Sequence, residues 1–184
     1  MKVLIIPEDP TYNGYILKPL IKRLLTSVGK PNAKVDLLTN PHAQGYDMVK
    51  ALLPDIFERY HHFDLLLFLP DQDCKDRLAE MTNLEQRAAA AGVKLITCAA
   101  VQEVEAWLLA GHHDKLQENW LMVREDGAIK ERFFEPFLNE YGDRGAGGGR
   151  ERLMRETLRN FDGLLARCPE LKDLQARIRG VVAA

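Results

Sequence analysis

Four short apolar runs divide the first 110 residues of this 184-residue chain. They are KVLII at 2–6, KVDLL at 34–38, DLLLFL at 64–69 and VKLITC at 93–98. Their lengths predict β-strands. The strands are apolar on both faces, so we expect the sheet to be covered on its two sides.

Helical patterns lie between these runs, with apolar residues three or four positions apart. The first is Ile16, Leu20, Ile21, Leu24 and Leu25, the second is Met48, Ala51, Leu52 and Ile56, and the third is Leu78, Met81 and Leu84 with the alanine run that follows. Gly92 ends the third pattern and is its expected C-terminal cap. Strands that alternate with helices predict an α/β fold with a four-stranded, mainly parallel, Rossmann-like sheet flanked by helices.

The pattern changes after residue 110. Polar helices are expected at 128–141, 150–166 and 169–178, with the flexible loop GDRGAGGGR at 142–150 between the first two. We therefore predict an α/β domain over residues 1–110. Residues 111–184 form a helical C-terminal extension packed on the same domain.

Composition narrows the class of protein. Apolar residues make up 46 % of the chain, enough for a real core, and the formal net charge of -2 argues against a generally basic nucleic-acid coat. Three widely spaced cysteines without a CxxC pattern indicate reduced thiols and no zinc site. No apolar run is long enough for a secretion signal or a membrane span, which predicts a soluble, cytoplasmic protein with no membrane partner.

Acidic residues gather where the predicted strands end. Glu8 and Asp9 follow the first strand, Asp71, Asp73 and Asp76 follow the third, and Glu103 and Glu105 follow the fourth, whereas TNPHAQG after the second strand has no acid. In folds of this kind the first strand commonly lies beside the third, with the fourth next along, and ligands bind at the carboxyl edge. We therefore expect these acids to converge.

Each acid also has a simple structural explanation. Glu105 fits the first turn of a helix, where the helix dipole favours a carboxylate, and the other acids fit turns and helix caps. Their convergence favours a site over these explanations. Crowded carboxylates repel one another without a cation, and a set of oxygen ligands without His or Cys suits Mg²⁺ or Mn²⁺. Such a centre can organise attack on a phosphodiester.

An acid after the first strand, D-x-D after the third and an acid opening the next helix resemble the Toprim fold. Topoisomerases, primases and overcoming-lysogenization-defect (OLD) nucleases share that fold. More narrowly, QEVEAWLLA and the late CPEL are similar to small uncharacterised bacterial Toprim-like proteins, often encoded beside an ATPase and suspected of a role in phage defence.

The resemblance implies a role for each acid. Glu8 would be the family's first glutamate, acting as metal ligand or general acid/base, and Asp71 and Asp73 would be the metal-binding pair. Glu105 would be a further ligand or orienting acid, with Glu103 as an additional metal candidate. Catalysis is thereby expected from Glu8, Asp71 and Asp73.

Three positions depart from the family pattern. Asp9 stands where a glycine usually follows the first glutamate, and Tyr12 stands where nuclease relatives often place a second acid. Arg150 occupies the later segment in which a lysine is expected.

Four arginines near the glycine-rich loop are candidates for binding nucleic acid. Arg150, Arg152, Arg155 and Arg159 follow the loop, the last three at helical spacing on roughly one face. Loop amides and the helix N-terminus could cradle phosphate while the arginines track a strand. The alternative is a solvated charged face, since glutamates are interleaved with the arginines.

The leading hypothesis is an Mg²⁺- or Mn²⁺-dependent nuclease or nicking enzyme. DNA is expected over RNA as its substrate, and an ATPase encoded nearby as its partner in phage defence. One alternative is a receiver-like signalling module in which Glu8 and Asp9 bind Mg²⁺, Asp71 accepts phosphate and Thr97 supplies a hydroxyl. That module requires a fifth strand, for which the sequence offers no convincing candidate. A third reading is an inactive Toprim-like binding scaffold.

Overall fold

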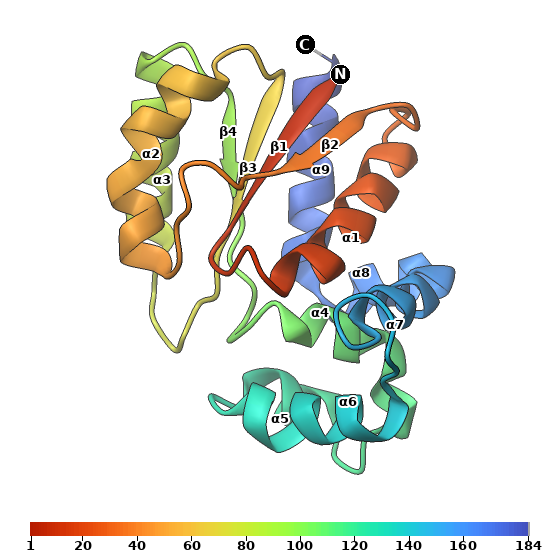
Figure 1. The fold of residues 1–184 in the computed structure, drawn as a ribbon. Coiled ribbons are helices and arrows are strands. Elements are labelled where there is room, and N and C mark those ends of the chain that lie inside the picture. The colour runs from red at the N-terminus through yellow and green to blue at the C-terminus, as the bar shows by residue number, and fades with distance from the viewer. Residues whose placement is uncertain (184) are drawn as a thin grey trace.

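The computed structural model describes residues 1–183 and contains one sheet of four parallel strands (Figure 1). The strands are β1 (Lys2–Pro7), β2 (Lys34–Leu37), β3 (Leu65–Leu69) and β4 (Leu95–Thr97), in the order β2-β1-β3-β4. The predicted α/β fold with a four-stranded parallel sheet and a helical C-terminal region is confirmed. The first strand indeed lies beside the third, with the fourth next to it.

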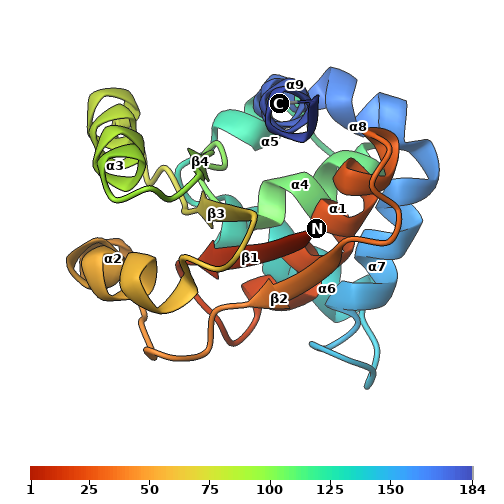
Figure 2. The ribbon, with the colours of Figure 1, turned by 90° about the horizontal axis from the view of Figure 1, so that it is seen from above.

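Both faces of the sheet are buried, which explains the unbroken apolar runs. Leu4, Ile6, Leu66 and Phe68 pack under α2 (Tyr46–Tyr60) and α3 (Leu78–Ala90). The alternating residues of β1 and β3 belong to the second cluster, with α1 (Asn13–Ser27). Figure 2 shows α2 and α3 on one face and α1, α4 and α9 on the other.

The helical C-terminal region continues directly from the sheet. Its elements are α4 (Glu105–Leu109), η1 (Ala110–Lys115), α5 (Trp120–Glu125), η2 (Lys130–Phe134), α6 (Glu135–Tyr141), α7 (Arg150–Thr157), η3 (Leu158–Asn160), α8 (Phe161–Arg167) and α9 (Pro169–Ala183). Of these, α5 and α6 lie beyond the edge at which the strands end (Figure 1).

Two of the predicted C-terminal helices are irregular. The helix expected at 128–141 begins as the π-helical turn η2, and the one expected at 150–166 is interrupted by η3. The interruption occurs because the Asn160 side chain accepts a hydrogen bond from the Gly163 amide at 3.0 Å and so caps a new helix, α8. The pattern did not predict α5, which has only six residues and is capped by Asn119.

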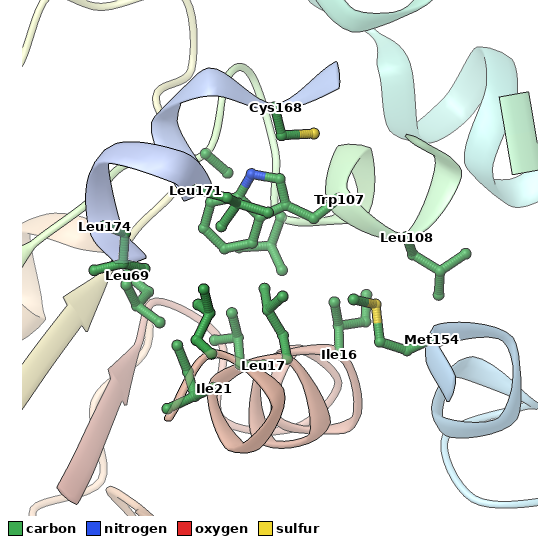
Figure 3. Packing of buried hydrophobic residues seen from close by; sticks show 14 of the residues in the cluster. Ile16, Leu17, Ile21, Leu69, Trp107, Leu108, Met154, Cys168, Leu171 and Leu174 are labelled. Carbon is green, nitrogen blue, oxygen red and sulfur yellow. The ribbon is translucent and has the colours of Figure 1, made fainter. Parts of the chain in front are cut away.

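Trp107 lies at the centre of the larger core cluster and is fully buried. In Figure 3 its indole lies between Leu171 of α9 and the apolar face of α1. The indole Nε1 donates to the Glu170 carboxylate at 2.9 Å, and Arg124 donates to the same carboxylate at 2.7 Å. The boundary predicted at residue 110 thus falls inside one continuous hydrophobic core.

The glycine-rich loop is a defined turn against α1. Gly147, Gly148 and Gly149 have φ values of 64°, 66° and 88°, a left-handed conformation that L side chains rarely adopt. A Cβ on Gly147 would lie 2.5 Å from the Tyr15 ring, so glycine is also needed for this close approach. The loop delivers the chain to Arg150, where α7 begins.

Among residues 1–183, no helix is both long and apolar enough to cross a membrane.

Candidate functional site

Glu8 links three loops by hydrogen bonds at the carboxyl edge of the sheet. Its Oε1 accepts a hydrogen bond from the Tyr46 amide at 3.1 Å, and its Oε2 accepts one from the Asp71 amide at 3.2 Å. The Glu8 carbonyl also accepts from the Gly45 amide at 3.0 Å. Burial is the largest cause and raises the pKa of the Glu8 carboxyl, the two amides lower it and the charge of Asp73 raises it, so that the pKa lies above its usual value.

Asp71 lies at the end of β3, where the pairing of β3 with β4 continues as a bridge to Ala100. Its Oδ1 accepts a hydrogen bond from the Val104 amide at 2.7 Å. Burial, followed by the charges of Glu105, Glu8 and Glu103, raises the pKa of Asp71 from 3.8 to about 8. The carboxyl is therefore poised to titrate in the neutral range, which is a property of functional sites.

Glu105 is the most deeply buried acid at this edge, with 2 % of its side chain exposed. It opens α4, and its Oε1 lies 3.8 Å from the Lys130 ammonium. Its Oε2 is buried and has no hydrogen-bond partner among the described residues. Burial is the main cause that raises the pKa of Glu105.

Lys130 provides the positive charge nearest to these acids. Its Nζ lies 3.5 Å from Oε2 of Glu103 as well as 3.8 Å from Glu105. Burial by itself would lower the pKa of Lys130, but Glu105, Glu103 and Asp71 together raise it. The sequence analysis did not identify this lysine. It lies in η2, 25 positions beyond Glu105, in a segment whose pattern indicated only a polar helix.

Asp73 forms an ion pair with Arg77. Its Oδ2 accepts a hydrogen bond from Arg77 at 3.1 Å, and its side chain is 44 % exposed on the rim of the site. Arg77 is buried and stacks on the Tyr46 ring, with 3.6 Å between the guanidinium carbon and the ring centroid. The expected pair is thus divided: Asp71 is half-buried and accepts from the Val104 amide, whereas Asp73 is exposed and paired with Arg77.

The loops that carry the acids contain unusual backbone conformations. Asp73, Cys74 and Gln102 are the non-glycine residues of the described chain with positive φ, at 50°, 57° and 60°. The Gln102 side chain fixes this arrangement, accepting from the Cys74 amide at 3.0 Å and donating to the Glu125 carbonyl at 3.2 Å. Backbone strain of this kind is concentrated at functional sites.

Arg150 is the predicted arginine that is most closely tied to the acids. Its guanidinium carbon lies 4.6 Å from the Tyr12 ring centroid and 5.2 Å from that of Phe134. It donates to the Gly147 carbonyl at 2.7 Å, and its charge lowers the pKa of Glu105. Its Nε is buried without a hydrogen-bond partner in the described part of the chain.

The remaining predicted arginines differ in their surroundings. Arg152 donates to Asp143 and Glu156 at 2.6 Å each and also to the Tyr141 carbonyl, which ties the glycine-rich loop to α7. Arg155 forms an ion pair with Glu151, one turn away on α7. Arg159 is exposed in η3. These contacts give Arg152 an internal structural role.

The fit of a metal ion depends on these oxygen ligands. Across residues 1–183, no three His, Cys, Asp or Glu side chains already form a group that could hold a metal ion. The charges of Glu8, Glu103 and Glu105 nevertheless all act on Asp71, and the Lys130 ammonium is acted on by Asp71, Glu103 and Glu105. The unpartnered oxygen of Glu105 and the raised pKa of Asp71 indicate that the nearby cations do not fully balance these acids.

Comparisons with known proteins add no relative: no family model, curated protein or solved structure matches this chain.

Proposed function

We propose that the chain is a divalent-cation-dependent phosphodiesterase that nicks or degrades DNA, or RNA as the less favoured substrate. The observation that supports this most is that Glu8, Glu103 and Glu105 all act on the Asp71 carboxyl at the carboxyl edge of the sheet, where Lys130 is the cation within 4 Å of Glu103 and Glu105. One buried and three half-buried carboxylates that lie near one another are costly unless positive charge balances them.

Glu8, Asp71 and Glu105 are the proposed ligands of Mg²⁺ or Mn²⁺, with Glu103 beside them. Once bound, the ion supplies positive charge that activates water and stabilises the phosphate oxygens. The cation also favours the ionised form of Asp71, which is otherwise opposed by burial and by its acidic neighbours.

Other residues have roles of their own in the proposal. Glu8 has a pKa above its usual value and is the candidate for general acid/base chemistry. Asp73 lies at the rim, where release from Arg77 would allow it to join the acids. Arg150 is the proposed phosphate contact, because its guanidinium is held by two aromatic rings beside Glu105.

The resemblance to Toprim-like proteins agrees with this chemistry and suggests a setting for it. In that setting the chain is the cytoplasmic nuclease partner of an ATPase in phage defence. Co-purification with an ATPase encoded beside it would support the setting, and a neighbouring histidine kinase would favour signalling.

The receiver alternative agrees less well with the geometry. Residues 1–183 contain no fifth strand after β4. Thr97 is buried, and its hydroxyl donates to Glu85 at 2.5 Å, so it does not face Asp71. Incubation with acetyl phosphate tests this alternative, which predicts a phosphorylated Asp71.

The proposed activity is tested by cleavage of supercoiled plasmid and of labelled single strands with Mg²⁺ or Mn²⁺. We expect the wild-type protein to cleave and Asp71→Asn to lose at least about 100-fold in rate, as when a group that stabilises charge in the transition state is removed. Asp76→Asn is the matched control. Asp76 belongs to the same loop but is exposed, and it caps the Leu78 amide with an oxygen that asparagine retains.

Each of the remaining outcomes contradicts part of the proposal. Equal rates for wild type and Asp71→Asn would place the activity elsewhere. A wild-type protein that binds Mn²⁺ and nucleic acid without cleaving either substrate would instead be the inactive scaffold.

A further inference from the structure

A groove lies between α1 and α7. Its volume is about 520 Å³, and its lining includes Thr11, Tyr15, Lys18, Lys22, Glu151 and Arg155. It begins at Pro10, two positions after Glu8, so the loop that presents Glu8 also forms one end of the groove. We call it the α1–α7 groove.

The charge of the groove differs from that of the whole chain. Lys18 and Lys22 are exposed and form no ion pair among residues 1–183, whereas Arg155 is paired with Glu151. The groove therefore carries two unbalanced positive charges on a protein whose formal net charge is -2. The two lysines are one turn apart on α1, a rise of about 6 Å along the helix.

Two exposed aromatic rings belong to this part of the chain, and one of them, Tyr15, lines the groove. Tyr12 is 48 % exposed and Tyr15 is 37 % exposed, although both are large residues with apolar rings. Tyr15 lines the groove and packs against Gly147. The Arg150 guanidinium forms a cation–π contact with the Tyr12 ring. Tyr15, Lys18 and Lys22 follow one another at helical spacing, so they share one side of α1.

Aromatic platforms followed by unpaired cations are the features by which proteins bind single-stranded nucleic acid. We propose that the α1–α7 groove binds a single strand on one side of the cleaved phosphate. A base stacks on Tyr15, and Lys18 and Lys22 contact successive parts of the backbone. The placement of the strand relative to the acids rests on the proposed function. The binding of a single strand in the groove does not depend on that function.

The test measures the affinity for a labelled single-stranded oligonucleotide by fluorescence anisotropy, in EDTA and over a range of salt concentrations. The variant Lys18→Ala/Lys22→Ala should bind more weakly. The slope of log affinity against log salt should become shallower by about 1.4, from two lost phosphate contacts at about 0.7 each. Tyr15→Leu should weaken binding about tenfold and leave the slope unchanged.

Lys34→Ala/Lys94→Ala is the matched control, because these exposed lysines lie at the opposite, amino end of the sheet. It should change neither affinity nor slope. Thermal unfolding of each variant checks that the fold is retained, as expected for exposed side chains.

The outcomes separate this inference from the proposed function. Weaker binding by the lysine variant, with no cleavage by the wild-type protein, would support the groove and contradict the nuclease. Cleavage by wild type with affinity and slope unchanged in the variant would overturn the groove. Failure of the wild-type protein to bind single strands, or equal effects of both lysine pairs, would also overturn it.

Discussion

Asp71 owes its properties to the residues around it rather than to its own loop. The Val104 amide fixes one carboxylate oxygen at 2.7 Å, while burial and three neighbouring acids oppose ionisation. A structural cap would be expected to hold its carboxylate charged at low cost. The environment of Asp71 instead favours the protonated form.

Asp71→Asn tests this description through the pH dependence of stability in EDTA. The pKa of Asp71 is about 8 in the folded protein and near its ordinary value of 3.8 when unfolded. Its contribution to the free energy of unfolding is therefore fully present below about pH 4 and is lost as pH rises through about 8. The asparagine keeps the Val104 hydrogen bond but does not titrate.

The variant should consequently gain stability relative to wild type as pH rises from 4 to 8. Urea unfolding at pH 5, 7 and 9 measures this difference. A difference that is constant over this range would contradict the raised pKa of Asp71.

Lys130→Met tests whether the lysine and a bound cation serve the same carboxylates. Removing the ammonium leaves Glu103 and Glu105 without their nearest positive charge, which should lower the free energy of unfolding by about 1–2 kcal/mol, between the values for exposed and buried pairs. Mn²⁺ should then raise the melting temperature of the variant more than that of wild type. Equal increases would mean that the two cations act independently.

At the scale of elements, the four loops at the carboxyl edge are joined to one another. Glu8 connects the loops after β1, β2 and β3, and Gln102 connects the loops after β3 and β4 with the end of α5. The glycine-rich loop then places Arg150 beside them. The site is thus assembled from several elements, with α1 and α7 providing its cationic side.

Two glycine substitutions test the role of the glycine-rich loop. Gly147→Ala should lower the free energy of unfolding by about 2 kcal/mol, since φ is positive and the new Cβ would meet the Tyr15 ring. Gly180→Ala is the matched substitution within α9, where a Cβ meets nothing within 4 Å, and it should add about 0.5–1 kcal/mol. Denaturant unfolding measures both. Changes in the free energy of unfolding that have the same sign for both variants would contradict the role given to the loop glycines.

Hydrophobic patterning predicted the elements that are long and buried on a regular face. It gave the four strands and placed Glu8, Asp71 and Glu105 at one edge, because parallel strands bring their carboxyl ends together. It did not reveal the break at Asn160, which depends on one side-chain hydrogen bond. The short helix α5 has too few residues for a periodic signal.

Side-chain partners were the part of the site that the sequence did not determine. The pairing of Asp73 with Arg77 and the approach of Lys130 to Glu105 depend on how loops and η2 pack, which no local spacing records. The arginines after the glycine-rich loop look alike in sequence. Only the structure separates Arg150, beside the acids, from Arg152, which ties the loop to α7.

At the scale of the whole molecule, one core joins the sheet to the C-terminal helices. Trp107, with the apolar faces of α1 and α9, belongs to a single buried cluster that crosses residue 110 (Figure 3). A fragment of residues 1–110 would expose that face of α1 and of the sheet to water. We therefore expect the fragment to lack cooperative thermal unfolding by circular dichroism. A cooperative transition in the fragment would contradict a shared core.

At the scale of the whole molecule, acidic and basic side chains are also separated into different regions. A chain close to neutral overall gathers buried and half-buried acids at the carboxyl edge of the sheet and leaves unpaired lysines in the α1–α7 groove. This arrangement suits a cation held by the acids and an anionic strand held by the groove.

Titration calorimetry with Mn²⁺ tests the claim most directly, because it reports cation binding without requiring a substrate. The wild-type protein should bind Mn²⁺, and Asp76→Asn should bind it equally well. Asp71→Asn should bind it at least about tenfold more weakly, since each 1.4 kcal/mol of lost interaction is a factor of ten. Absence of binding by the wild-type protein, or unchanged binding by Asp71→Asn, would contradict a divalent-cation site at these acids.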